Sequence, residues 1–138
     1  FEIDPRAVKD VRFVRRLAAA QKDGTQWPDV IESALGAELT VGWEYYPTTA
    51  ECVAALKADG YTILAIEQVE GAVMLDEFEV DTTKKYALVF GNEVEGVDQA
   101  VVDMCDGAIE IPQVGIKHSL NVSVSAGVLM WEMFRQLR

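Results

Sequence analysis

Three short and nearly continuous apolar runs constrain the fold more than any other feature of the sequence. They are YTILAI at residues 61–66, YALVF at 86–90 and AIEI at 108–111. Each run has the length of a strand, and strands that are apolar on both faces belong in a sheet covered on both sides. Because helical patterns separate the runs, the sequence predicts an α/β fold with a mostly parallel sheet and helices on both faces.

Capping signals mark two of the expected helices. Thr48 and Glu51 have the spacing of a capping box, and the helix that they open is expected to end at Gly60. Asp98 is expected to cap a short helix that carries Val101, Val102 and Met104.

The other expected elements rest on the apolar pattern alone. Apolar positions at 8, 11 and 17–20 favour a helix over residues 6–20, and QKDGTQWP at 21–28 reads as a loop. Alternation in LTVGWEYY predicts a strand at 39–46. The last helix, expected at about 119–137, is apolar on more than one side, which indicates burial within the domain and against a partner.

Composition excludes several classes of protein. With 138 residues the chain suits a single domain. Its 12 basic and 23 acidic residues give a net charge of −11, which argues against a broad basic face that grips nucleic acid. Two cysteines and one histidine are too few for a disulfide framework or a zinc site, so no metal is expected. Without a membrane-length apolar run or a signal peptide at residues 1–10, the expected location is the cytoplasm.

Two loops carry the candidate chemistry, and each follows an apolar strand. Gly91-Asn92-Glu93-Val94-Glu95-Gly96 follows YALVF, and residues 112–118 lead from AIEI to Ser119 and Asn121. Ligands of open α/β sheets bind outside the carboxyl ends of the strands. Each loop also has a simpler interpretation, since the first could be an ordinary turn and Ser119 and Asn121 could merely cap the last helix.

Considered together, the two loops resemble a known family. The runs ALVFGNEVEGV, AIEIP and KHSLNVSVSAGVLMWE resemble the last two signature motifs of the SpoU (TrmH-like) branch of the SPOUT RNA methyltransferases, and the likeness extends over residues 34–138. It implies one SPOUT-type domain over residues 1–138 with a C-terminal trefoil knot. It also implies a homodimer that transfers a methyl group from S-adenosylmethionine to a ribose 2′-hydroxyl of tRNA or rRNA.

The resemblance assigns roles to particular residues. The cofactor would contact Ile66, Gly91, Ile111, Ser119 and Leu120. The polar positions that organise catalysis would be Glu93, Ser119 and Asn121, together with Arg16 of the first motif. Methyl transfer from a sulfonium is an in-line displacement, so these groups would act by alignment and electrostatics. A guanidinium stays protonated, which favours an orienting role for Arg16 over a role as base.

The first motif departs from the family pattern and leaves alternatives open. The segment KDVRFVRRLAAAQKDG, near residues 8–24, has Arg16 and a small-residue run, but it lacks the Asn and Gly that precede the arginine in the family. One alternative is therefore a non-catalytic knotted module that binds cofactor or RNA. Another, independent of the resemblance, is a small α/β domain that binds a regulatory nucleotide.

Overall fold

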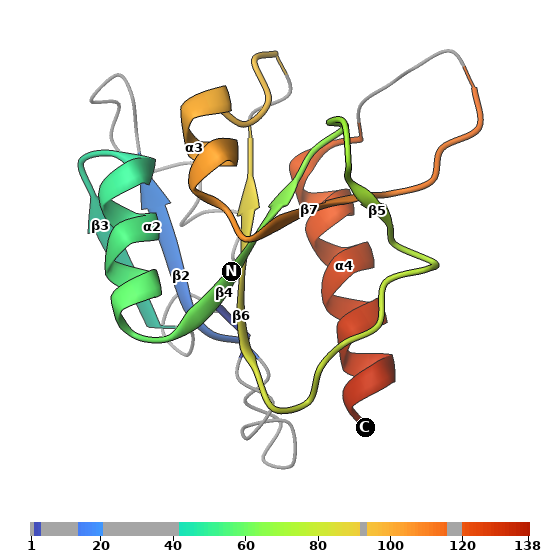
Figure 1. The fold of residues 1–138 in the computed structure, drawn as a ribbon, viewed down its shortest axis with the longest axis horizontal. Helices are drawn as coiled ribbons and strands as arrows, with labels where there is room; N and C mark the ends of the chain where they lie inside the picture. Colours follow the sequence, from blue (N-terminus) through green and yellow to red (C-terminus); the bar gives the residue numbers. More distant parts are fainter. Residues whose placement is uncertain (1, 4–13, 21–41, 92–93, 116–119) are drawn as a thin grey trace.

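A single mixed sheet forms the centre of the protein. In this computed structural model the described residues are 2–3, 14–20, 42–91, 94–115 and 120–138. Within them the strands are β1 (Glu2–Ile3), β2 (Val14–Ala20), β3 (Gly42–Tyr46), β4 (Tyr61–Ile66), β5 (Val73–Met74), β6 (Lys85–Phe90) and β7 (Gly107–Glu110). The helices are α2 (Thr49–Ala58), α3 (Gln99–Met104) and α4 (Val122–Leu137) (Figure 1).

The sheet is mostly parallel, as the sequence predicts. Its order is β3-β2-β1-β6-β4-β7-β5, and β4 pairs in parallel with both β6 and β7. The pairs β2–β3 and β5–β7 are parallel as well, whereas β1 is antiparallel to its two neighbours. The three apolar runs therefore lie side by side, and their carboxyl ends meet at one edge of the sheet.

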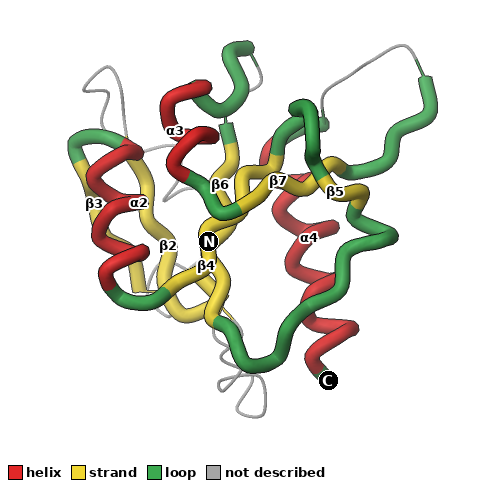
Figure 2. The backbone as a smooth tube through the Cα atoms, in the orientation of Figure 1, coloured by secondary structure: helices red, strands yellow, loops and turns green. Residues whose placement is uncertain are grey.

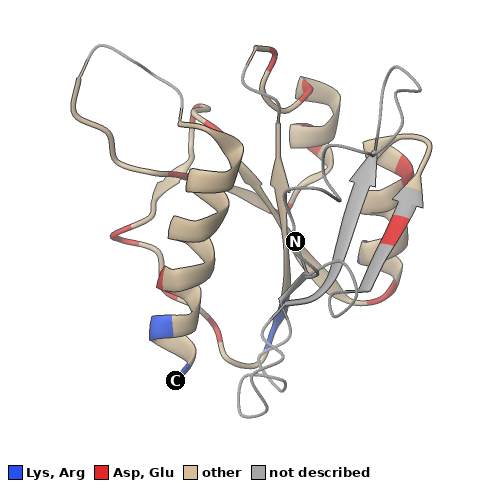
Figure 3. Ribbon diagram, turned by 180° about the vertical axis from the view of Figure 1, so that it is seen from behind, with Lys and Arg blue, Asp and Glu red and all other residues tan. Residues whose placement is uncertain are grey.

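Helices cover both faces of the sheet, as the apolar character of the central strands predicts. Helices α2 and α3 lie on one face and α4 on the other, as opposite views show (Figures 1 and 3). Side chains alternate between these layers because successive strand residues point to opposite faces. Ile63 packs with the cluster under α2 and α3, whereas its neighbour Leu64 packs with Leu129 and Met133 of α4.

The predicted capping residues begin each of the three helices in the described part of the chain. Thr48 accepts a hydrogen bond from the Glu51 N–H at 3.2 Å, and Asp98 accepts one from the Ala100 N–H at 3.1 Å. Gly60 follows α2 with φ of +82°, a conformation in which glycine carries no steric cost. Helix α4 begins at Val122, three residues later than expected from the sequence.

One predicted element is wrong. Residues 14–20 form strand β2 rather than a helix, and residues 6–13 lie outside the described part of the chain. An alanine-rich run favours a helix locally, but here Arg16 to Ala20 pair in register with Gly42 to Tyr46 of β3. Tertiary pairing of this kind overrides local propensity. The two-residue strands β1 and β5 were too short to be predicted.

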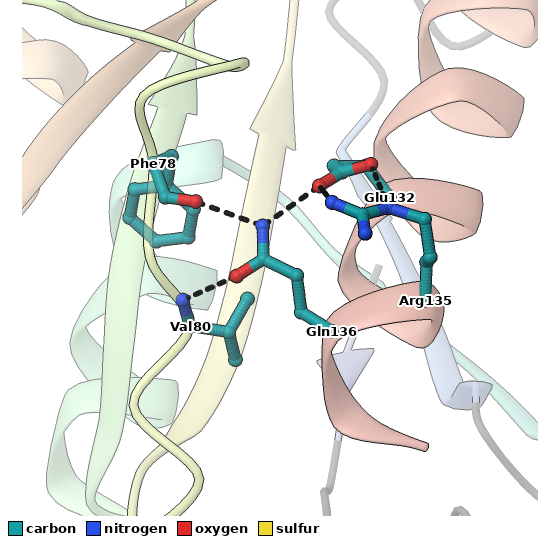
Figure 4. Close-up of polar contacts among 5 residues, drawn as sticks. All are labelled: Phe78, Val80, Glu132, Arg135 and Gln136. Atoms are coloured by element: carbon teal, nitrogen blue, oxygen red, sulfur yellow. Dashed lines mark hydrogen bonds and ion pairs between the residues drawn. The ribbon is translucent and has the colours of Figure 1, made fainter.

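A side-chain amide ties the last helix to the connection between β5 and β6 (Figure 4). The Gln136 amide donates to the Phe78 carbonyl and accepts from the Val80 N–H, both at 2.8 Å. Its nitrogen also donates to Glu132, which pairs with Arg135. Hydrogen bonds from Arg135 and Gln136 lower the pKa of Glu132 to about 2. Gln136 thus satisfies two backbone groups of a segment that has no strand partner at that point.

Replacing Gln136 with alanine tests this contact. We expect Gln136→Ala to lower the free energy of unfolding by about 1–3 kcal/mol, because two partly buried backbone groups lose their partner. The neighbouring Arg135→Ala is the control, since an exposed ion pair contributes about 0–1 kcal/mol. Chemical denaturation measures both variants, and equal losses would contradict a specific role for the amide.

Candidate functional site

A cavity of about 380 Å³ lies at the carboxyl ends of β4, β6 and β7. The loop segments that leave these strands can be followed in Figure 2. The cavity walls come from the strand ends, the loop after β6 and the start of α4. The described lining residues are Ile66, Glu67, Gln68, Val69, Phe90, Gly91, Val94, Glu95, Gly96, Val97, Gln99, Glu110, Ile111, Gln113, Leu120, Val122 and Ser125.

Two glycines close the stem of the loop after β6. A Cβ atom on Gly91 would lie 2.0 Å from the Gly96 carbonyl carbon and 2.3 Å from the Val97 nitrogen, so the backbone there leaves no room for a side chain. Gly96 has φ of +66°, and its own Cβ would lie 2.3 Å from a Glu67 carboxylate oxygen. Both glycines are therefore required by the loop geometry, and the two ends of the loop pack directly against each other.

The described cavity wall is negatively charged. Glu67, Glu95 and Glu110 line it, and none of the described lining residues is a lysine or arginine. The Lys and Arg residues with described side chains lie elsewhere, near the amino ends of β4 and β6 or at the end of α4; they are Lys57, Lys84, Lys85, Arg135 and Arg138. A cavity of this charge favours a cationic ligand over a polyphosphate.

Four of the five residues assigned to the cofactor lie in this one cavity. Ile66, Gly91, Ile111 and Leu120 come from four different segments, and all of them line it. Ser119, the fifth, lies outside the described residues, and so does Glu93. The structure thus brings together the strand ends that the sequence had pointed to.

The two remaining candidates lie in regular structure. Asn121 caps α4, accepting hydrogen bonds from the Ser123 N–H at 2.9 Å and from the Ser123 hydroxyl, so the capping interpretation describes its side chain here. Arg16 lies in β2, where its backbone pairs with Gly42 and Glu2.

Sequence reasoning missed Glu67. It directly follows β4, and its carboxylate accepts hydrogen bonds from the Val97 N–H at 2.9 Å and the Gln68 N–H at 3.0 Å. Its position after an apolar strand was the available signal, since polar residues at such positions face the ligand site of α/β sheets. Its partner lies 30 residues away, which no local pattern reveals.

The tryptophan and cysteine side chains that the structure describes do not line the cavity. Trp131 is 57% exposed on α4, while Trp27 lies outside the described residues. Cys52 is buried and Cys105 half-buried, and burial raises the pKa of the Cys105 thiol. Across the described ranges, no group of three or more His, Cys, Asp or Glu residues is placed to hold a metal ion. None of the helices in the described part of the chain combines the length and apolar character needed to cross a bilayer.

An α/β sheet with a cavity at its strand ends is common to a broad class of enzymes and binding domains. Comparison with known proteins identifies the family within that class. The family model described as the SpoU rRNA methylase family matches residues 6–131. A tRNA (guanosine(18)-2′-O)-methyltransferase of Thermus thermophilus is 39% identical over 109 residues, which cover 79% of this chain and 55% of that protein. The protein of the same name from Escherichia coli is 33% identical, over 82% of this chain and 48% of its own.

Solved structures agree with the sequence relatives. The TrmH/SpoU tRNA modifying enzyme of A. aeolicus superposes with a TM-score of 0.79 at 30% identity, covering 96% of this chain and 66% of that one. The chain belongs to the SpoU rRNA methylase family, which confirms the resemblance seen in the sequence. It spans about half the length of the curated relatives that it matches.

Substituting Gly91 tests the closure of the loop. We expect Gly91→Ala to lower the free energy of unfolding by about 1–3 kcal/mol, because a Cβ there forces the two ends of the loop apart. Gly107→Ala on β7 is the matched control, since its Cβ would meet only the Leu64 Cδ2 atom, at 3.4 Å. Thermal unfolding compares the two, and a Gly91→Ala protein as stable as the control would contradict the packed stem.

Proposed function

We propose that the protein is an S-adenosylmethionine-dependent methyltransferase that modifies a ribose 2′-hydroxyl of tRNA or rRNA. One observation carries the proposal. Four residues that family resemblance assigns to the cofactor, from four segments of the chain, line one cavity at the carboxyl edge of the sheet. Family membership and relatives named as tRNA 2′-O-methyltransferases support the same reaction.

The residues of the cavity fit S-adenosylmethionine. Ile66, Ile111 and Leu120 supply apolar surface for an adenine, and Gly91 lines the same cavity without a side chain. The carboxylates of Glu95 and Glu110 suit the sulfonium and ammonium charges of the donor. The same charges disfavour ATP, which weighs against a regulatory nucleotide site.

Catalysis by this chain would rest on alignment. When bound, the donor supplies an activated methyl group. Glu93, Ser119 and Asn121 would orient the donor and the 2′-hydroxyl for in-line transfer. Arg16 would hold the target ribose or its phosphate, because a guanidinium pairs well with phosphate oxygens. Because the described edge of the cavity is acidic, the RNA would rely on residues outside the described side chains, namely Arg12, Arg15, Arg16, Lys117 and His118.

The proposal includes the architecture that the family implies. Residues 1–138 would form one SPOUT-type domain, with the C-terminal segment threaded through a loop as a trefoil knot. On this proposal the protein acts in the cytoplasm, requires no metal and works as a homodimer. An exposed apolar row on α4 supports the dimer: Val124, Val128 and Trp131 are 52%, 39% and 57% exposed at the spacing of one helix face.

A transfer assay tests the activity. Incubation of the protein with labelled S-adenosylmethionine and unmodified tRNA and rRNA should yield 2′-O-methylated ribose, detected by nucleoside mass spectrometry. Asn121→Asp keeps a capping oxygen and should retain stability but lower turnover about tenfold or more, if the amide acts on the reacting groups.

Three outcomes would revise this proposal. Donor binding without transfer to any RNA would favour the non-catalytic module that the incomplete first motif suggests. Tighter binding of ATP than of S-adenosylmethionine would favour the nucleotide site. Full turnover by Asn121→Asp would reduce Asn121 to a helix cap.

Truncation of Trp131 tests the dimer. We expect Trp131→Ala to raise the dimer dissociation constant about thirtyfold, as loss of an interface hot spot of about 2 kcal/mol does. The control is Val73→Ala, which truncates an exposed apolar side chain on β5. Sedimentation velocity over a concentration series measures both, and an unchanged dimer in Trp131→Ala would place the interface elsewhere.

A further inference from the structure

Glu67 links the ends of the three central strands. It is the first residue after β4, and its backbone N–H donates to the Ile109 carbonyl of β7 at 3.2 Å. Its side chain reaches the other way, to the Val97 N–H beyond the loop after β6, at 2.9 Å. A single residue thus connects β7, β4 and the loop of β6 at the edge where the cavity lies.

The carboxylate and the loop have complementary shapes. One Glu67 oxygen occupies the space that a side chain on Gly96 would need, since a Cβ there would lie 2.3 Å from it. The Val97 nitrogen that it holds is also the atom against which Gly91 packs. Gly91, Gly96, Val97 and Glu67 therefore form one contiguous contact in the cavity wall.

The second carboxylate oxygen is also held. It accepts from the Gln68 N–H at 3.0 Å, so the side chain is fixed at both oxygens and is half-buried. Hydrogen bonds to an ionised acceptor are stronger than neutral ones, and two of them restrict the rotamer. The Glu67 side chain is thus held in one conformation as part of the cavity wall.

We propose that Glu67 is a positioning residue for the methyl donor, whose carboxylate holds Val97 and so fixes the wall formed by Gly91 and Gly96. This inference rests on the proposed function, since it names the group that shapes the same cavity for the donor. Glu67 acts through the loop backbone, and both of its oxygens are engaged by N–H groups of the chain itself.

Substitution of Glu67 separates positioning from charge. In the full chain, Glu67→Ala should raise the dissociation constant of S-adenosylmethionine about tenfold, the loss expected for one charge-assisted hydrogen bond. Glu67→Gln keeps an oxygen that can accept from Val97 and should recover most of the affinity. Glu70→Ala, an exposed acid three residues away and outside the cavity lining, is the control and should bind as the wild type does.

Calorimetry measures the affinities, and hydrogen exchange at Val97 reports the contact without any ligand. Faster exchange at Val97 in Glu67→Ala, with recovery in Glu67→Gln, supports the proposal. Wild-type exchange in Glu67→Ala overturns it even if the donor binds. Equal affinity losses in Glu67→Ala and Glu67→Gln also overturn it, because they assign the effect to charge. A wild-type protein that binds no donor would instead refute the proposed function.

A second pair of variants tests the complementary shape. Gly96→Ala should lower the melting temperature more than Gly71→Ala, because both glycines have positive φ but only Gly96 faces an atom at clashing distance. In the Glu67→Ala background the difference between the two should shrink, since the clashing oxygen is gone. An undiminished difference would show that Glu67 does not pack against Gly96 in solution.

Discussion

Burial of β4 on both faces is the constraint on which the rest of the structure depends. Ile63 is completely buried on the side of α2 and α3, and Leu64 is buried on the side of α4. A strand of this kind cannot sit at the surface, so the chain must provide helices for two opposite faces. Helix α4 provides the second cover, with Leu129 and Met133 fully buried against the sheet.

The same arrangement explains why the cavity forms where it does. Parallel pairing of β4 with β6 and β7 brings three strand ends to one edge, and α4 starts at that edge because it must run down the opposite face. Residues at the strand ends and in the loops that follow them then line the cavity. The position of the cavity therefore follows from the way in which helices cover the sheet. Gly91, Gly96 and Glu67 then determine the local shape of its wall.

Much of this organisation could be predicted from local sequence. The runs containing Ile63, Leu88 and Ile109 predicted the central strands, because short and continuous apolar runs are typical of strands that are buried on both faces. Thr48, Asp98 and Asn121 marked helix starts, since their side-chain oxygens replace missing backbone partners there.

The remainder depended on contacts between distant residues. VRRLAAA at 14–20 forms a strand only because β3 lies beside it, and local propensity favours a helix there. The role of Glu67 depends on Val97, and that of Gln136 on Phe78 and Val80, which are more than 50 residues from it. Family resemblance pointed to the residues of the cavity, but the close packing of Gly91 against Gly96 and Val97 follows from no local pattern.

The attachment of Gln136 to residues 78 and 80 has a consequence for biosynthesis. The seven described strands precede α4 in the chain, so they leave the ribosome before it does, and domains begin to fold as they emerge. Until α4 arrives, Leu64 and Leu88 lack their cover, and the backbone at Phe78 and Val80 must remain hydrated. The apolar face of the sheet that carries Leu64 and Leu88 therefore stays exposed to water until α4 has been synthesised and has packed against it.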